Sequence, residues 1–398
     1  IQRNDILVDV VNTTARALLG LTVECAQCHT HKFDPISIRD YYRFQAFFTK
    51  GQPVNVVLSG EGEAARELVE ERWRIFDTVH DRLVVAKRRQ GVPDPIYIVP
   101  ATVIRGMKPA EKKRFEELDR AIAGFDQTWA WYSPMTANGD VAVAPHEMRW
   151  PLPRRPSVLE RLRTTILIRG DVKSRGPEVS PGWPAVFGPM PGEPDNPRLA
   201  LANWMTDPAN PLVARVWVNR IWQWHFGHGL VETSGDFGTQ GTPPTHPELL
   251  DFLASELIDS GWSTRHIHRL ILNSATYRQS STFSAANDAI DPGNQLLWRW
   301  TPRRLEAEAI RDSILAVSGQ LDARRGGPSD EGASSRRSIY LRQRRGNLPH
   351  QQMLFDGANG IASCTQRRVS TTALQPLWLL NSRFIQDAAE ALATRVET

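Results

Sequence analysis

Apolar residues recur three and four positions apart through most of this chain, and a glycine closes most of the segments in which they do so. This spacing gathers apolar side chains on one face of an α-helix, and glycine commonly stands just beyond a helix C-terminus. The pattern therefore predicts a mainly α, multi-helical fold with a small irregular β or loop segment in the middle. The expected helices cover residues 5–19, 37–51, 61–90, 109–123, 210–226, 245–258, 263–277, 301–317 and the tail from 371.

Shifts in composition divide the 398 residues into four predicted segments. They are the end of a cysteine-bearing domain, a helical hairpin, a Pro/Gly-rich linker or small β segment, and a helical domain, over residues 1–60, 61–128, 129–197 and 198–398. Thr165–Ile168 is the best strand candidate, and residues 175–184 are expected to form a turn-rich loop. In the last segment four helices should pack together around a core drawn from Trp204, Trp217, Trp222, Trp224 and Trp262.

The charge balance narrows the class of protein only weakly. Lys and Arg number 48 against 44 Asp and Glu, and seven of the 48 are Lys, so 41 are Arg. This bias fits a GC-rich genome, or it fits guanidinium binding of phosphates, carboxylates or sulfates. The arginines near the C-terminus could bind polyanions or lie in a solvated, ion-paired loop; they are Arg336, Arg337, Arg342, Arg344, Arg345, Arg367 and Arg368.

Two further features concern targeting. No run of about 18 apolar residues is present, so the sequence predicts no membrane span. The chain begins at Ile1 inside a helical pattern, and we interpret it as a fragment or a processed form.

The motif that carries chemistry is Cys25-Ala26-Gln27-Cys28-His29, the C-x-x-C-H signature of haem c attachment. Two thiols three residues apart can each add to one vinyl group on the same porphyrin edge, and the adjoining imidazole can then reach the iron. The pattern therefore predicts covalent haem c on Cys25 and Cys28, with His29 as the metal ligand.

The same residues allow two other interpretations. In the first, Cys25, Cys28 and His31 bind zinc, with Cys364 or Asp34 as the fourth ligand. In the second, the two motif cysteines form a local disulfide or redox pair. By itself His31 is most often a solvated loop residue, and Cys364 by default a buried, inert thiol.

No other site stands out in the sequence. A sixth iron ligand would have to come from a distant segment, and no spacing rule selects among His225, His228, His246, His266, His268 and several Met. We expect His225, His228 and His246 to be structural. Asp236, Glu248, Asp251 and Glu256 fit helix caps or solvent-facing positions, and no nucleotide-binding or hydrolase motif is present, so no catalytic residue is predicted.

Longer stretches resemble two known domains. Residues 19–36 (LGLTVECAQCHTHKFDPI), followed by Arg39-Asp-Tyr-Tyr and Gln45-Ala-Phe-Phe, resemble the end of the planctomycete cytochrome-c-like domain of unknown function. Residues from 198 onward resemble its usual partner, the planctomycete-specific domain of unknown function. The pieces that carry this second resemblance include Arg198-Leu-Ala-Leu-Ala-Asn-Trp, Val218-Asn-Arg-Ile-Trp, His225-Phe-Gly-His-Gly-Leu-Val, Asn273-Ser-Ala-Thr-Tyr-Arg-Gln-Ser and Thr371-Thr-Ala-Leu-Gln-Pro-Leu.

The resemblance implies a c-type haem and a periplasmic or otherwise extracytoplasmic location. It implies electron transfer, or redox support of a secreted polysaccharide-degrading system, more than turnover of a substrate. The expected partners are an unidentified redox protein and proteins of polysaccharide degradation, and no nucleic acid. The alternatives are a non-redox interaction module with a structural zinc site, and an uncharacterised carbohydrate-active enzyme.

Overall fold

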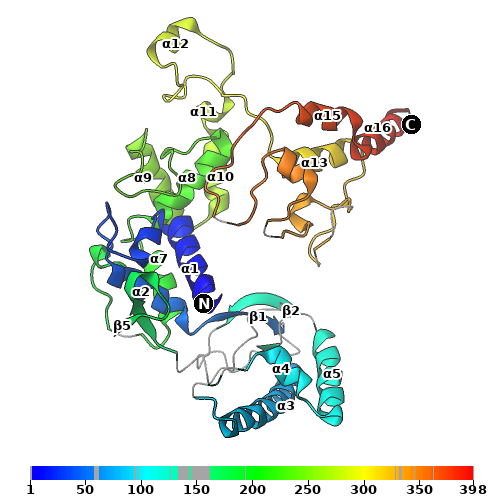
Figure 1. Ribbon diagram of the computed structural model, residues 1–398. Coiled ribbons are helices and arrows are strands. Elements are labelled where there is room, and N and C mark those ends of the chain that lie inside the picture. Colours follow the sequence, from blue (N-terminus) through cyan, green and yellow to red (C-terminus); the bar gives the residue numbers. More distant parts are fainter. Residues whose placement is uncertain are drawn as a thin grey trace. The chain divides into compact units, whose positions relative to one another are not determined.

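The computed structural model describes most of the chain and divides it into two compact units (Figure 1). The first comprises Ile1–Asn12 and Val23–Trp204, and the second Thr13–Thr22 and Met205–Thr398. The expected mainly α fold with a small β part is confirmed. The described residues are 2–57, 62–93, 96, 98–125, 127–132, 143–144, 162–192, 194–327, 329–330, 334–344, 346–361 and 363–397.

Local signals account for the helices of the first unit. Ser37 caps α2 because its hydroxyl accepts from the Asp40 backbone N–H while the Asp40 carboxylate accepts from the Ser37 N–H, a capping box. Pro109 stands at the first position of the fifth helix, where its missing N–H costs nothing. The helices are α1 (Gln2–Thr14), η2 (Glu24–Gln27), α2 (Ile38–Thr49), α3 (Gly62–Arg89), α4 (Pro100–Arg105), α5 (Pro109–Ala123) and η5 (Ala185–Phe187).

The predicted hairpin of residues 61–128 is formed by α3 and α5. Buried Val69, Leu118 and Ile122 pack between the two helices. At the other end Arg82 donates to both carboxylate oxygens of Glu111 at 2.9 Å. Among the described residues, apolar packing and ion pairs hold the two helices of this hairpin together.

Two small antiparallel sheets complete the first unit. Strands β1 (Gln52–Val57), β2 (Gln127–Tyr132) and β3 (Val143–Ala144) pair in the order β2-β1-β3, and β4 (Thr164–Leu167) pairs with β5 (Arg175–Val179). The strand predicted at 165–168 is confirmed as β4. The turn-rich loop predicted from 175 was wrong for its first five residues, because they pair with β4, and β1 and β2 were not predicted. Much of the predicted linker lies outside the described residues.

The core of the second unit lies between three helices, α8, α9 and α10. Val218, Ile221, Leu257 and Ile267 are fully enclosed there. The elements of this unit are η1 (Ala15–Leu19), α8 (Val213–Phe226), α9 (Pro247–Asp259), α10 (Thr264–Asn273), α11 (Ala275–Arg278), α12 (Ala285–Ile290), α13 (Ala307–Val317), η6 (Ser338–Tyr340), α14 (His350–Leu354), α15 (Leu374–Asn381) and α16 (Arg383–Glu397), while α7 (Pro197–Met205) leads into it.

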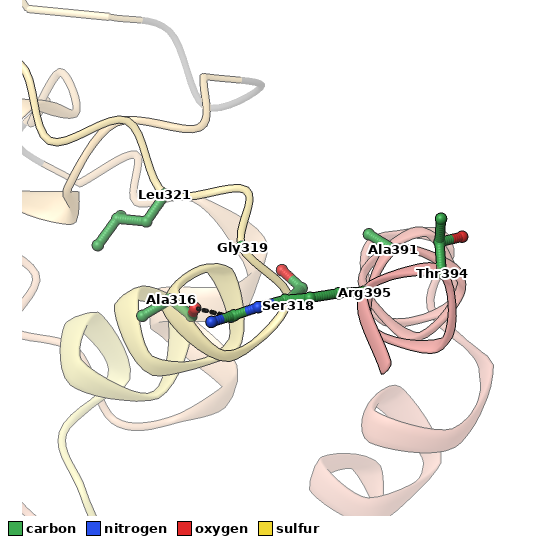
Figure 2. Close-up of a pocket in the computed structure, with 7 residues that line it drawn as sticks. All are labelled: Ala316, Ser318, Gly319, Leu321, Ala391, Thr394 and Arg395. Carbon is green, nitrogen blue, oxygen red and sulfur yellow. Dashed lines mark hydrogen bonds between the residues drawn. The ribbon is translucent and has the colours of Figure 1, made fainter. Parts of the chain in front are cut away.

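The fourth helix of the predicted compact domain lies elsewhere. It begins at Ala307 rather than at Thr301, and it packs on α14, α16 and η6 instead of on α8–α10. Figure 2 shows one such contact, in which Arg395 of α16 reaches the C-terminal end of α13. Its guanidinium donates to the carbonyls of Ala316 and, at 3.0 Å, Val317, and so pairs a positive charge with the negative end of the helix dipole.

The prediction that five tryptophans form the core is confirmed for three of them. Trp222 is buried and Trp217 and Trp262 pack against the core. Trp224 is 51% exposed, and Trp204 belongs to the first unit, where it stacks on Trp183 with ring centroids 4.9 Å apart. None of the described helices has both the length and the hydropathy needed to cross a membrane.

Candidate cofactor site

The predicted haem residues lie on one tight turn. η2 is a 3₁₀ helix whose last hydrogen bonds run from the Cys28 and His29 N–H groups to the Cys25 carbonyl, at 3.3 and 3.4 Å. Residues three apart eclipse each other in a 3₁₀ helix, so Cys25 and Cys28 project on the same side. Both thiols are free and exposed, and His29 is exposed directly after them.

A side chain of helix α2 holds this turn in place through a hydrogen bond. The buried Tyr42 donates its hydroxyl proton to the Gln27 carbonyl at 2.9 Å, inside the motif. Burial, with a further contribution from Cys28, raises the pKa of Tyr42 to about 12, so the phenol stays protonated and remains a donor. The turn is therefore fixed by a side chain that is itself enclosed.

The two histidines of the loop have different surroundings. The exposed His29 has its Nδ1 2.8 Å from the Thr30 carbonyl. His31 is buried, and its Nδ1 accepts from the Asp34 backbone N–H at 2.9 Å, with the Asp34 carboxylate 3.5 Å away. The default expectation of a solvated His31 is wrong, because this imidazole organises the loop that follows the motif.

The β4–β5 hairpin reaches the same site, an approach that was not predicted from the sequence. Gly170, in the turn after β4, adopts φ of +73°, and a Cβ on it would lie 2.8 Å from the Cys28 Sγ. The adjoining Arg169 also has positive φ. This juxtaposition joins residues far apart in the sequence; the positive-φ glycine is the one local signal that could have pointed to a close approach.

Exposed apolar side chains stand on the loops around the thiols. Phe33 is 48% exposed on the loop after the motif, and Ile168, two residues before Gly170, is 53% exposed. The Lys32 ammonium lies 5.0 Å from the centre of the Phe33 ring, so Ile168 is the one of the two that is available to a ligand with an apolar face.

Cys364 and the histidines considered as distant iron ligands lie in the second unit. Cys364 is exposed and its Sγ contacts the Gln366 carbonyl at 3.3 Å, so the expectation of a buried thiol is wrong. His225 and His268 share a 2.7 Å hydrogen bond, and His266 lies 2.7 Å from Glu256. Within the described ranges no three side chains of His, Cys, Asp or Glu gather closely enough to hold a metal ion, and Cys25, Cys28 and His31 form no such group.

Comparison with known proteins gives two family matches. The family described as "Protein of unknown function (DUF1553)" matches residues 197–398, which is half of the chain. A second, described as "Protein of unknown function (DUF1549)", matches residues 1–52, which include the thiol turn. No curated protein and no solved structure is significantly similar to the chain.

Proposed function

The chain belongs to the DUF1553 family of proteins of unknown function, and from its thiol turn we propose that it is an extracytoplasmic c-type haem protein. The observation that carries the proposal is the presence of two exposed thiols on one side of a single turn, with an exposed imidazole next in the chain. The proposed role is electron transfer, or redox support of a secreted polysaccharide-degrading system.

The donor set fits the chemistry of attachment. The Sγ atoms of Cys25 and Cys28 would each bond to one vinyl carbon, with the thiol proton going to the neighbouring carbon, so no oxidant is consumed. His29 would ligate iron through Nε2, because a proton on Nδ1 can be donated to the Thr30 carbonyl at 2.8 Å, as is usual for metal-bound imidazoles. The haem supplies a one-electron couple when it is bound.

Two features of the surroundings support the same proposal. The exposed Ile168 offers an apolar contact to a porphyrin face, and the Tyr42 hydrogen bond holds the turn in place without occupying either thiol. The resemblance of residues 19–36 to the planctomycete cytochrome-c-like domain points in the same direction. A covalently held c-type haem is attached outside the cytoplasm, which supports the periplasmic or extracytoplasmic location.

The decisive experiment is production of the protein together with a cytochrome c maturation system. We expect a mass increase of one haem, a haem stain that survives denaturation, and a pyridine haemochrome spectrum typical of two thioethers. Cys25→Ser and Cys28→Ser should each remove one thioether, whereas the matched control Cys364→Ser, also an exposed free thiol, should leave the spectrum unchanged.

The contrary result is equally specific. Protein that carries no haem but binds one zinc ion would overturn the proposal in favour of an interaction module with a structural zinc site. Recovery of the native full-length protein from the cytosolic fraction would contradict the proposed location.

A further inference from the structure

A cleft in the second unit has five arginines in its lining. Its volume is about 1010 Å³. The C-terminal end of α8 forms one side, the extended residues 303–306 ahead of α13 form another, and residues 355–358 and 364–370 form the rest. The charged side chains that line it are Arg220, Arg303, Arg304, Arg367, Arg368, Glu306 and Asp356.

Two of these arginines are neutralised by carboxylates of the fold. Arg304 donates to the Asp356 carboxylate at 2.6 Å, and Arg367 donates to Glu308 at 3.1 Å and lies 3.4 Å from Glu306. Hydrogen bonds from Ser370 and Arg304 hold the pKa of Asp356 below its ordinary value, so this carboxylate stays ionised. Both acidic groups of the cleft are therefore already engaged.

The other three arginines have no carboxylate partner within the described part of the chain. Arg220 donates to the Arg16 carbonyl at 3.0 Å, and Arg303 donates to the Trp224 carbonyl. Arg368 is exposed and makes no hydrogen bond or ion pair with any described residue. A guanidinium stays charged in proteins, so these three arginines carry positive charge that no carboxylate of the described residues balances directly.

Arg220 gives the most direct sign that a partner is missing. Its side chain is partly buried, and its Nε is enclosed without a hydrogen-bond acceptor among the described residues. A buried donor that is left unpaired costs free energy, which an arriving oxyanion would offset. Trp224, which is half exposed, also lines this cleft.

We propose that this cleft binds the oxyanion of a small ligand, a carboxylate, sulfate or phosphate, through Arg220, Arg303 and Arg368. The planar fork of a guanidinium matches two oxygens of such a group, and Trp224 covers an apolar part of the ligand beside it. The site uses none of the residues assigned to haem and does not depend on haem being present.

The test is calorimetric titration of the full chain with three separate probes, inorganic phosphate, inorganic sulfate and glucuronate. We expect saturable binding of at least one probe, and Arg368→Ala should weaken it about tenfold or more, because a charge-assisted hydrogen bond is lost. The matched control is Arg269→Ala, which removes an exposed arginine of α10 outside the cleft and should leave binding unchanged. Tighter binding of glucuronate than of both inorganic ions would identify a carboxylate-bearing sugar as the source.

A second variant separates charge from geometry. Arg303→Lys keeps the positive charge but loses the fork, and it should weaken binding while the thermal melting temperature stays close to that of the parent. Failure of all three probes to bind would overturn the proposal. Equal weakening by Arg368→Ala and Arg269→Ala would also overturn it, since binding would then follow net charge and not the cleft.

Discussion

At the scale of single residues, two histidines two positions apart have opposite roles. His29 is exposed and contacts the Thr30 carbonyl, whereas His31 is buried and accepts the Asp34 N–H. Removing an exposed side chain costs little stability, but removing the partner of a buried donor leaves that donor unsatisfied. We therefore expect loss of His31 to lower the stability of the fold, and loss of His29 to affect only the proposed iron ligation.

We predict that His31→Ala lowers the free energy of unfolding by about 1–3 kcal/mol and leaves the spectrum of the haem-loaded protein unchanged. His29→Ala should do the reverse, with a stability change within about 0.5 kcal/mol and loss of the nitrogen-ligated spectrum. Denaturant titration and absorption spectroscopy measure the two effects. A changed spectrum in His31→Ala alone would instead make His31 the ligand.

Gly170 offers a second test at this scale, with a control in the same unit. Gly170 and Gly188 both have positive φ, +73° and +88°, but an added Cβ has neighbours within 4 Å only at Gly170, the nearest of them the Cys28 Sγ at 2.8 Å. Alanine in the left-handed region costs about 1 kcal/mol or more at either position. The contact with sulfur adds to this cost at Gly170 alone.

We therefore predict that Gly170→Ala destabilises the protein more than Gly188→Ala and slows alkylation of Cys28 in the haem-free protein. The added methyl group covers one side of the thiol, while Gly188→Ala leaves the alkylation rate unchanged. Peptide mapping after timed alkylation measures the rate at Cys28. Equal rates in the two variants would show that the hairpin does not approach the thiol in solution.

At the scale of elements, local capping was predictable and distant pairing was not. Ser37, Ser263 and Pro109 mark the starts of their helices as the sequence indicates. The helix expected from Thr245 begins two residues later, at Pro247, and the Thr245 hydroxyl donates to the Leu230 carbonyl instead of capping it. When the partner of a hydroxyl lies far away in the sequence, the neighbouring residues do not predict that hydrogen bond.

The candidate site also combines features that neighbouring residues predict with contacts between distant segments, which they do not predict. The cysteine spacing alone predicts two thiols and an imidazole on one surface turn. The approach of the β4–β5 hairpin to Cys28 and the Tyr42 support join segments that fold together only through tertiary contacts. The arginine cleft likewise gathers residues from 220 to 370, and of its arginines only Arg367 and Arg368 stood out in the sequence.

The hydrogen bond between His225 and His268 joins α8 to α10 and makes their packing sensitive to pH. Burial, then His268 and Arg303, lower the pKa of His225 from the ordinary 6.5. The folded state thus favours the neutral imidazole. The associated stability is complete above the ordinary pKa and is lost as pH falls through the lower, folded value.

We predict that the free energy of unfolding decreases as pH falls below 6.5 and that His225→Gln flattens this decrease. Its size should be on the order of 1 kcal/mol at most, since solvent screens a partly exposed group. Denaturant titrations over a pH series give the profile, with His228→Gln, an exposed imidazole beside α8, as the control. A profile unaltered by His225→Gln would mean that other groups set the pH dependence.

At the scale of the molecule, the second unit takes in a piece of the N-terminal sequence. Thr13–Thr22 belongs to it, although the sequence predicted a domain made only of residues from 198 onward. The Gly20 carbonyl accepts the Phe237 N–H at 2.6 Å, and a Cβ on Gly20 would lie 2.8 Å from the Phe237 ring and 2.9 Å from Val216. Val216 is buried in α8, so this segment completes part of the core.

A substitution near the start of the chain should therefore destabilise the unit built from its end. We predict that Gly20→Ala costs about 2–4 kcal/mol, combining strain at φ of +60° with overpacking against Phe237 and Val216. Gly261→Ala, at φ of +67° with no neighbour within 4 Å, should cost only the strain, about 1–2 kcal/mol. Amide hydrogen exchange in α8 reports the unit directly, and protection there should fall further in Gly20→Ala than in Gly261→Ala. Equal protection in the two variants would mean that residues 13–22 are not part of this core in solution, and that residues from 198 onward can fold without them.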